Sequence, residues 1–402
     1  MSETMKKPRI RFKGFTEAWE QRKAIELAEY SKGNGYSKND LTEVGTPIIL
    51  YGRLYTKYQF SINEIDTFAQ PRSGAVYSQG NEVIIPASGE TAEDIARASA
   101  VEKSGVLLGG DLNVLRPFGF IAPEFLALAL SNGEPQKELA KKAQGKSVVH
   151  IHNSDIQEVS IAYPSRAEQD CIVSVFRRLD NIITLHQRKY DKLLNIKKSM
   201  LEKMFPKNGN DVPEIRFKGF TDAWEQRKFE DVGSVAMCKR IFKNETSEEG
   251  DVPFYKIGTF GGVPDAYISR ELFEEYKKVY QYPNKGDILI SASGSIGRTV
   301  EYTGEDEYYQ DSNIVWLKHG DDLDNSFLRV LYIIVEWSCE GSTIKRLYND
   351  NFLKTEFMLP KIEEQIKIGK YFANLDNLIT LHQRKLEKLK NIKKSMLEKM
   401  FV

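Results

Sequence analysis

Apolar side chains recur at alternating spacings of four and three residues along two stretches of the chain, one near its middle and one at its end. The first stretch, 168–204, contains neither proline nor glycine. A stripe that continues for about four heptads is typical of a coiled-coil seam, and a helix of about 38 residues spans roughly 57 Å. The predicted seam residues are Leu179, Ile183, His186, Tyr190, Leu193, Met200 and Met204 in the first stretch and Leu375, Ile379, His382, Leu386, Leu389, Met396 and Met400 in the second.

Both stripes lie in one chain, so the two helices are natural partners for each other. Pro164 and Pro360 stand just before them, where proline is tolerated. Because the segment between the helices must return to its start, we expect an antiparallel pair. The alternative is an intermolecular coiled coil that joins two chains. For His186 and His382, a histidine satisfied within the seam is a simpler interpretation than a metal ligand or a catalytic base.

The chain contains an internal duplication. Residues 8–23 match 213–228 at 14 of 16 positions, and residues 179–205 match 375–401 at 23 of 27. Between these blocks the repeats diverge, since 145–178 and 341–374 agree at only seven of 34 positions. Each half is therefore a variable module followed by a nearly invariant helix. The predicted division is a first module (1–163), a first helix (164–206), a second module (207–359) and a second helix (360–402).

The variable modules combine short strands with a few helices. Runs rich in β-branched residues and bounded by turn formers predict strands at 47–51, 82–86, 287–291 and 313–317, and helices are predicted at 122–130 and 326–337. Because regular βαβ spacing is absent, the fold class is α+β, with two mixed modules separated by two long helices in a pseudo-twofold repeat. Glycine–serine phrases at 88–89 and 293–297 follow strands and predict turns; the alternative is a close backbone approach to a phosphate.

Composition and charge narrow the class of protein. The 402 residues include 57 basic and 57 acidic side chains, and a net charge of zero argues against a protein that coats nucleic acid. The charge is uneven, however. Residues 166–206 and 363–402 each carry nine basic and five acidic residues (+4), whereas 1–165 carry 19 and 20 (−1) and 207–362 carry 20 and 27 (−7). The basic excess thus belongs to the invariant helices, as a solvated face or beside a polyanion.

Targeting and redox signals indicate a cytoplasmic protein. We expect no membrane span, because no apolar run reaches 18 residues, and no secretion, because the start lacks an apolar segment. The cysteines Cys171, Cys238 and Cys339 are odd in number and widely separated, which excludes a disulfide scaffold and a four-cysteine zinc site. A reducing cytoplasm is the natural setting.

Candidate enzyme chemistry is sparse. Asp265, Glu275 and Lys277 fit a loose nuclease pattern, but the pattern is degenerate and the first half has no equivalent. His150 and His152 lack a third metal ligand nearby. We find no catalytic constellation, and we expect no cofactor and no metal. Two alternatives stay open: a stand-alone nuclease that uses the Asp265 group, and a coiled-coil interaction protein without DNA affinity.

The order of motifs resembles a known family over essentially the whole chain. The phrase at 164–169 leads into a long helix that carries Leu-Asp-Asn-Ile-Ile at 179–183, and a similar phrase recurs at 359–365. Together with the strand–turn phrase at 286–298, this arrangement resembles the specificity subunit of a type I restriction–modification system. The first half departs from the family at 86–91, where the Ser-Ile-Gly-Arg ending is missing.

The resemblance implies a function. Each module would be a target-recognition domain that reads one half of a bipartite, asymmetric site in double-stranded DNA, and the helical pair would set the half-site spacing. At about 34 Å per turn of DNA, a helix near 57 Å can hold two modules over successive major grooves. The family further implies docking of two DNA adenine methyltransferase subunits on the repeated helices, a motor–nuclease restriction subunit that joins that complex, and a specificity chain that is not itself an enzyme.

Candidate DNA contacts are cations in or beside predicted loops, although a solvated surface charge is an equally good interpretation of each one. A base-reading arginine should cost about 1–3 kcal/mol when removed and relax specificity, whereas a phosphate-binding lysine should mainly reduce the salt dependence. The candidates are Arg53, Lys57, Arg72, Arg97 and Lys146 in the first module and Lys256, Arg298, Lys345 and Arg346 in the second.

Overall fold

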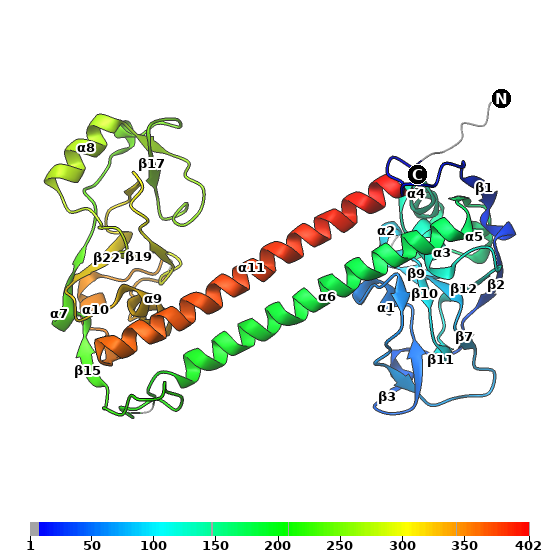
Figure 1. Cartoon of the computed structure of the whole chain (residues 1–402), viewed down its shortest axis with the longest axis horizontal. Helices are drawn as coiled ribbons and strands as arrows, with labels where there is room; N and C mark the ends of the chain where they lie inside the picture. The colour runs from blue at the N-terminus through cyan, green and yellow to red at the C-terminus, as the bar shows by residue number, and fades with distance from the viewer. Residues whose placement is uncertain (1–7, 146–147, 208, 343, 402) are drawn as a thin grey trace. The chain divides into compact units, whose positions relative to one another are not determined.

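The computed structural model describes residues 8–145, 148–207, 209–342 and 344–401. The chain forms two compact units, Met1–His186 with Arg384–Val402 and Gln187–Gln383. Each unit holds one variable module, the first half of the long helix that follows it and the second half of the other long helix. The first module is coloured blue to cyan in Figure 1 and the second green to orange.

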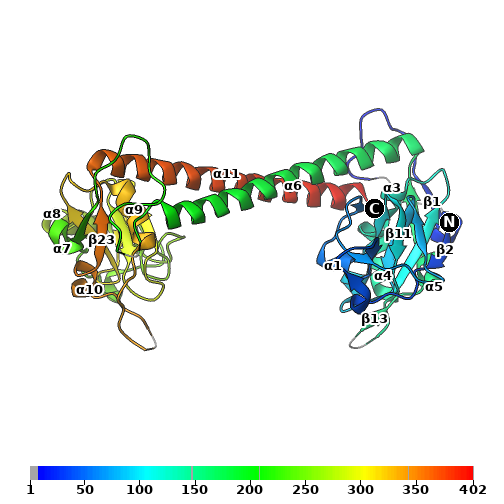
Figure 2. The ribbon, with the colours of Figure 1, turned by 90° about the horizontal axis from the view of Figure 1, so that it is seen from below.

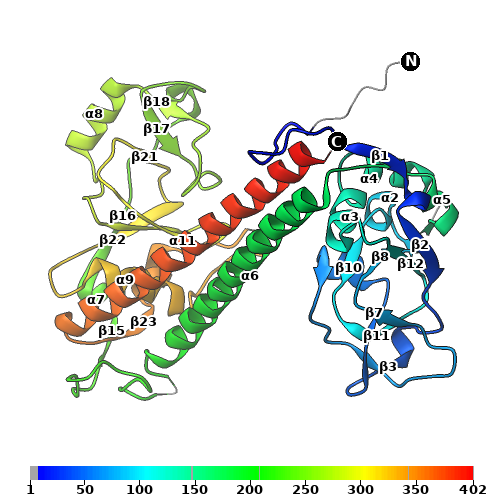
Figure 3. The same cartoon turned by 45° about the vertical axis from the view of Figure 1, so that its right-hand side comes forward.

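The first unit is built mainly from short strands. Two sheets form its body, in the orders β2-β12-β8-β10-β5 and β3-β6-β4-β11-β7, and β1 pairs antiparallel with β14. Figure 3 shows β2, β12 and β8 side by side. The elements are β1 (Glu20–Lys23), η1 (Ala24–Glu26), β2 (Ala28–Lys32), η2 (Lys38–Asp40), β3 (Leu41–Thr42), β4 (Thr46–Ile49), α1 (Arg53–Thr56), β5 (Ser61–Ile62), β6 (Phe68–Ala69), β7 (Tyr77–Gln79), β8 (Glu82–Pro86), β9 (Ser88–Gly89), α2 (Ala92–Ile95), β10 (Ser99–Val101), β11 (Ser104–Leu108), β12 (Leu112–Pro117), α3 (Pro123–Leu130), α4 (Gly133–Lys142), β13 (Val149–His150), α5 (Asn153–Gln157), β14 (Ser160–Tyr163) and α6 (Arg166–Lys203).

The second unit repeats this plan with fewer strands. Its sheets run in the orders β16-β22-β19-β20 and β18-β17-β21, and β15 pairs antiparallel with β23 as β1 does with β14. The elements are β15 (Glu225–Lys228), α7 (Phe229–Val232), β16 (Gly233–Ala236), η3 (Lys243–Glu245), β17 (Val252–Tyr255), β18 (Tyr267–Ile268), α8 (Arg270–Val279), β19 (Ile288–Ser291), β20 (Thr299–Glu301), β21 (Tyr308–Tyr309), β22 (Ile314–His319), α9 (Asn325–Ile334), α10 (Asn349–Leu353), β23 (Glu356–Leu359) and α11 (Ile362–Met400).

The long helices run antiparallel, as their ion pairs establish within each unit. In the first unit Lys393 Nζ lies 2.6 Å from Asp180 Oδ1, and in the second Lys197 Nζ lies 2.6 Å from Asp376 Oδ1. The residue numbers add to 573 in both pairs, as they must for two antiparallel helices in one register. All fourteen predicted seam residues are buried or half-buried.

The α+β fold class is confirmed, and so are the main predicted elements. The strands expected at 82–86 and 287–291 are β8 and β19, and the helix expected at 122–130 is α3. One expectation was wrong. Ser88–Gly89 is not a simple turn but the strand β9, which pairs with β13 about sixty residues further along the chain. Across the described ranges, none of the helices combines the length and apolar character needed to cross a bilayer.

Candidate nucleic-acid interface

A buried polar joint attaches the first module to helix α6. Arg11 donates two hydrogen bonds of 2.7 Å to the carboxylate of Glu168, whose side chain is 1% exposed. This bidentate bonding raises the pKa of Arg11 above its ordinary value. The next residue, Gln169, accepts a hydrogen bond from the amide of Ala122 at 2.8 Å and donates to the carbonyls of Phe120 and Pro164. The start of α6 is thus tied to two separate segments of the module, one at Arg11 and one at 120–122, and to Pro164 just before the helix.

The second unit contains the same joint, atom for atom. Arg216 donates two hydrogen bonds of 2.7 Å to Glu364, which is also 1% exposed. Gln365 accepts from the amide of Asp324 at 2.9 Å and donates to the carbonyls of Asp322 and Pro360 at 3.0 and 2.9 Å. Because the surrounding modules have diverged, this agreement indicates that the attachment of module to helix was retained as a unit.

An aromatic cluster beside each joint fixes the end of the other long helix. In the first unit, Phe401 at the end of α11 packs on Phe125 and Phe176 with ring centroids 5.8 and 6.3 Å apart. In the second unit, Phe205 at the end of α6 packs on Phe327 and Phe372 at 5.9 and 6.3 Å. Each module therefore binds the beginning of one long helix through the polar joint and packs against the end of the other through the aromatic cluster.

Each module also carries a short hairpin built on a common frame. Gln144 and His150 exchange backbone hydrogen bonds of 3.2 and 2.8 Å in the first module, and Glu340 and Arg346 exchange bonds of 3.0 and 2.8 Å in the second. The glycine that follows is required. Gly145 and Gly341 have φ of +140° and +102°, and a Cβ there would lie 1.9 and 2.4 Å from a carbonyl oxygen three residues later.

Several described side chains of these hairpins face solvent. Val148 is 49% exposed in the first module, and Ile344 and Tyr348 are 60% and 49% exposed in the second. Lys345 and Arg346 are also exposed, and among the described residues neither side chain makes an ion pair or a hydrogen bond. Figure 2 shows the segment that carries β13 projecting from the body of its module.

The cations predicted in the first module have mixed surroundings. Arg53 is 9% exposed and its guanidinium bonds Asp66 and the Glu64 carbonyl, both at 2.7 Å, so it is engaged inside the module. Lys57 is 57% exposed and bonds the same Asp66, and together Lys57 and Arg53 lower the pKa of that carboxyl to about 2.

Of the remaining first-module candidates, Arg72 and Arg97 each pair with a different carboxylate. Arg72 is 55% exposed, pairs with Asp40 and lies over the ring of Tyr36. Arg97 is 33% exposed and pairs with Asp94 at 3.3 Å. Lys146 lies outside the described residues. These cations are thus not gathered into one patch by direct pairing.

Three of the four second-module candidates belong to the hairpin or to the strand–turn phrase bonded to it: Lys345 and Arg346 lie in the hairpin, and Arg298 ends the phrase. Arg298 follows the phrase at 293–297, donates a hydrogen bond of 2.6 Å to the Ile257 carbonyl and lies over the ring of Phe260. Ser293 bridges to Arg346, and the amide of Gly294 bonds the Lys345 carbonyl at 3.1 Å. The strand–turn phrase and the hairpin therefore form one continuous surface.

The remaining candidate, Lys256, bears on the nuclease alternative. Its Nζ lies 2.8 Å from Asp265 Oδ1, so the carboxylate of the nuclease pattern is paired with a cation. Lys277 pairs with Asp306 at 3.3 Å. Within the part of the chain that the structure describes, no group of three or more His, Cys, Asp and Glu side chains is placed to hold a metal ion.

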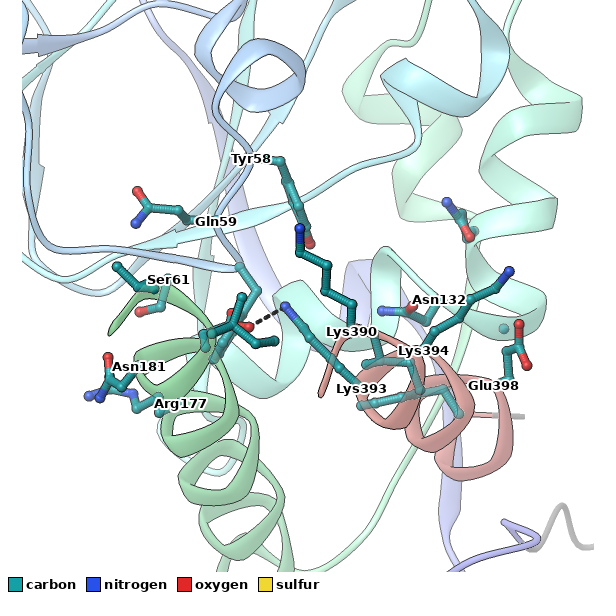
Figure 4. A pocket seen from close by; sticks show the side chains of 18 of the residues that line it. Tyr58, Gln59, Ser61, Asn132, Arg177, Asn181, Lys390, Lys393, Lys394 and Glu398 are labelled. Carbon is teal, nitrogen blue, oxygen red and sulfur yellow. Dashed lines mark ion pairs between the residues drawn. The ribbon is translucent and has the colours of Figure 1, made fainter. Parts of the chain in front are cut away.

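A basic cavity of about 1230 Å³ lies in the first unit, between α6, α11 and the loop before β5. Figure 4 shows Lys390, Lys393 and Lys394 on α11 and Arg177 on α6 among the side chains that line this cavity. Lys393 pairs with Asp180, and Arg177 pairs with Glu102 at 2.9 Å. Among the described residues, no ion pair joins Lys390, Lys394 or the lining residue Arg9 to a carboxylate.

Sequence reasoning did not single out these cavity cations, although the repeat carries a signal for them. Only two of the six differences within the matched blocks change a charge: Arg9 stands opposite Glu214, and Lys390 stands opposite Leu194. Both basic members line the cavity of the first unit. Divergence of the repeats has therefore made the lining of this cavity more basic than the matching positions of the second unit.

Comparison with known proteins identifies relatives for both halves. The family described as type I restriction modification DNA specificity domain matches residues 16–195 and 221–391. Protein S.HindORF215P of Haemophilus influenzae, whose name describes a type I restriction enzyme specificity subunit, is 42% identical over 260 residues, 59% of this chain and 61% of that protein. The MjaX specificity subunit of Methanocaldococcus jannaschii is 24% identical over 321 residues, 73% of this chain and 70% of that protein.

A solved structure shares the fold. The crystal structure of a type I restriction–modification system S subunit from M. genitalium matches with a TM-score of 0.63, over 98% of this chain and 99% of that one, at 15% identity. The family match extends over most of both repeats, and the duplicated modules and long helices agree with it. The chain belongs to the type I restriction–modification DNA specificity family.

Proposed function

We propose that this chain is the DNA-reading scaffold of a type I restriction–modification complex and carries out no catalysis of its own. Residues 1–163 and 207–359 are two target-recognition domains, and 164–206 and 360–402 are the spacer helices. The observation that carries the proposal is the repeated joint, Arg11–Glu168 and Arg216–Glu364, because it attaches two divergent modules to the helices in one manner. Different modules on equivalent attachments are what reading two different half-sites requires.

The helices set the half-site spacing and dock the methyltransferase subunits. Besides the seam, each unit exposes a second apolar stripe: Ile182 and Leu185 on α6 are 43% and 53% exposed, and Leu378 and Leu381 on α11 are 44% and 45% exposed. The two pairs occupy matching positions of the repeat. Exposed apolar side chains at i and i+3 form a surface suited to a protein partner. One adenine methyltransferase subunit on each stripe accounts for two subunits per chain.

Docking is tested by changing one stripe at a time. Leu185→Asp and Leu381→Asp should each reduce the number of co-purified methyltransferase subunits from two to one, and the double variant should retain none, as measured by light scattering of the purified complex. Lys192→Ala on the same helix is the control. If both single variants retain two subunits, the stripes are not the docking surfaces.

The function itself is tested by mapping methylation. The chain would be expressed with the neighbouring methyltransferase gene, and modified adenines would be mapped across the host DNA. We expect methylation at a bipartite, asymmetric sequence that disappears without this chain. A contiguous motif, or methylation that does not depend on the chain, would contradict the proposal. In the same proposal, the motor–nuclease restriction subunit binds to the complex of this chain with the methyltransferase subunits. The cysteines Cys171, Cys238 and Cys339 are free, which supports a reducing, cytoplasmic setting.

The basic cavity contributes to phosphate binding in this proposal. A chain with no net charge needs local cation clusters to bind a polyanion, and Arg9, Lys390 and Lys394 form such a cluster without acidic partners among the described residues. These residues would position DNA without reading its sequence.

A further inference from the structure

We propose that the two short hairpins, which the structure describes at 144–145 and 148–152 in the first module and at 340–342 and 344–348 in the second, are the elements that enter the major groove and read bases. The inference rests on the proposed function and assigns base reading to a particular part of each module. A narrow ribbon of chain fits the major groove, where every base pair presents a distinct pattern of donors, acceptors and methyl groups.

The first reason is that the hairpins share one frame. Besides the closing bonds and the glycine, each is fastened to its module at the same point: the amide of Ile151 bonds the Ala87 carbonyl at 3.0 Å, and that of Leu347 bonds the Ala292 carbonyl at 2.9 Å. Ile151 and Leu347 are 0% and 4% exposed. A buried aliphatic anchor and a backbone bond therefore hold the base of each hairpin rigidly.

The second reason is that the side chains on this frame have diverged. Residues 144–152 and 340–348 agree only at the glycine. The exposed positions carry Val148 and His150 in the first hairpin but Ile344 and Arg346 in the second. A retained backbone with different exposed side chains is expected where two copies of one fold must recognise different sequences.

The third reason is the chemistry of the exposed side chains. Arg346 and Lys345 supply donors that suit the acceptors of guanine, and Ile344, 60% exposed, supplies an apolar surface that suits the methyl group of thymine. Among the described residues neither cation has an ion pair or side-chain hydrogen bond inside the module. In the first hairpin, His150 is the exposed polar side chain at the position of Arg346.

The common frame allows an exchange of side chains that leaves the fold intact. In the forward graft, residues 344–348 take the residues of 148–152, by Ile344→Val, Lys345→Val, Arg346→His, Leu347→Ile and Tyr348→His. The reverse graft makes the opposite changes at 148–152. Each graft would be co-expressed with the methyltransferase subunit, and methylated adenines would be mapped. Lys278→Ala, an exposed cation at the end of α8, is the control.

We expect the forward graft to alter or relax one half of the bipartite motif and the reverse graft to alter only the other half, with the spacing unchanged. Arg346→Ala alone should lower discrimination at one base pair by about tenfold or more. Co-purification and melting temperature should stay as in the wild type, which separates misreading from misfolding. An unchanged motif in both grafts would overturn the inference while leaving the proposed function intact. A wild-type complex without a bipartite motif would overturn both.

Discussion

Removing the carboxylate of Glu364 should loosen the second unit where its module meets α11. Arg216 is 12% exposed at its side chain, and the Glu364 carboxylate supplies both of its charge-assisted partners. Glu364→Ala leaves this guanidinium enclosed, and the Asp222 carbonyl is then its one remaining acceptor among the described residues. Breaking a buried ion pair by deleting one partner costs about 3–5 kcal/mol. The loss should therefore be large compared with that of a surface pair, which is at most about 1 kcal/mol.

A double variant separates the charge effect from lost packing. Arg216→Met combined with Glu364→Leu removes both charges and fills their space with apolar atoms. Replacing a buried pair in this way is often neutral or stabilising. The double variant should thus be more stable than Glu364→Ala alone. Glu168→Ala is the matched change in the first unit, where Arg11 holds the same geometry.

Hydrogen exchange measured by mass spectrometry is the appropriate assay, because it reports each unit separately within the full chain. Amides of β15 and of the first turns of α11 should exchange about 100-fold faster or more in Glu364→Ala, which corresponds to about 3 kcal/mol. Amides of the first module should be unaffected. A loss below about 1 kcal/mol, or a double variant as unstable as the single one, would refute the reasoning that the joint is a buried charge pair.

Three further outcomes follow from local chemistry. Burial raises the pKa of the Cys238 thiol to about 12, so at pH 8 an alkylating reagent should label the exposed Cys171 first; equal labelling in native protein would contradict this. Because Lys57 and Arg53 together lower the pKa of Asp66 from 3.8 to about 2, the ionised Asp66 stabilises the folded state fully above about pH 4, and this stabilisation is lost as the pH falls through about 2. Lys57→Ala should raise that pKa in an NMR titration; an unchanged pKa would exclude the pair. Lys390→Leu should reduce the salt slope of DNA binding by about one without altering the methylated motif.

The features that could be predicted from the sequence are those that repeat over short distances. Helix α6 and its seam follow from a periodicity visible within a few turns, and strand β8 follows from a run of apolar residues between turn formers. The joint could be seen only in part. Glu168 and Gln169 are among the few retained residues of a divergent region, but Arg11, the partner of Glu168, lies 157 positions away, and no local pattern connects the two.

The hairpins, too, depend on contacts between distant segments that a local sequence pattern does not reveal. Ser88–Gly89 follows a strand and contains turn-forming residues, so local reasoning predicted a turn, whereas its pairing with Val149–His150 makes it a strand. Cations beside predicted loops could be named as candidates, yet a position beside a loop did not separate Arg53, which is enclosed, from Arg346, which is exposed. Which cations are available depends on tertiary partners, and these are set by contacts between distant segments.

The positions at which the two repeats agree distinguish the residues that attach a module to its helix from the exposed residues of the hairpins. In the region where only seven of 34 positions agree, Glu168, Gln169, Ile172 and Phe176 are buried with their counterparts at the junction of module and helix, and Gly145 shapes the hairpin turn. Retention therefore follows attachment and backbone geometry, while the exposed hairpin side chains are free to vary. Under the proposed function, a protein built in this way can acquire a new half-site by changing a few exposed hairpin residues, because neither the joint nor the helical seam takes part in the change.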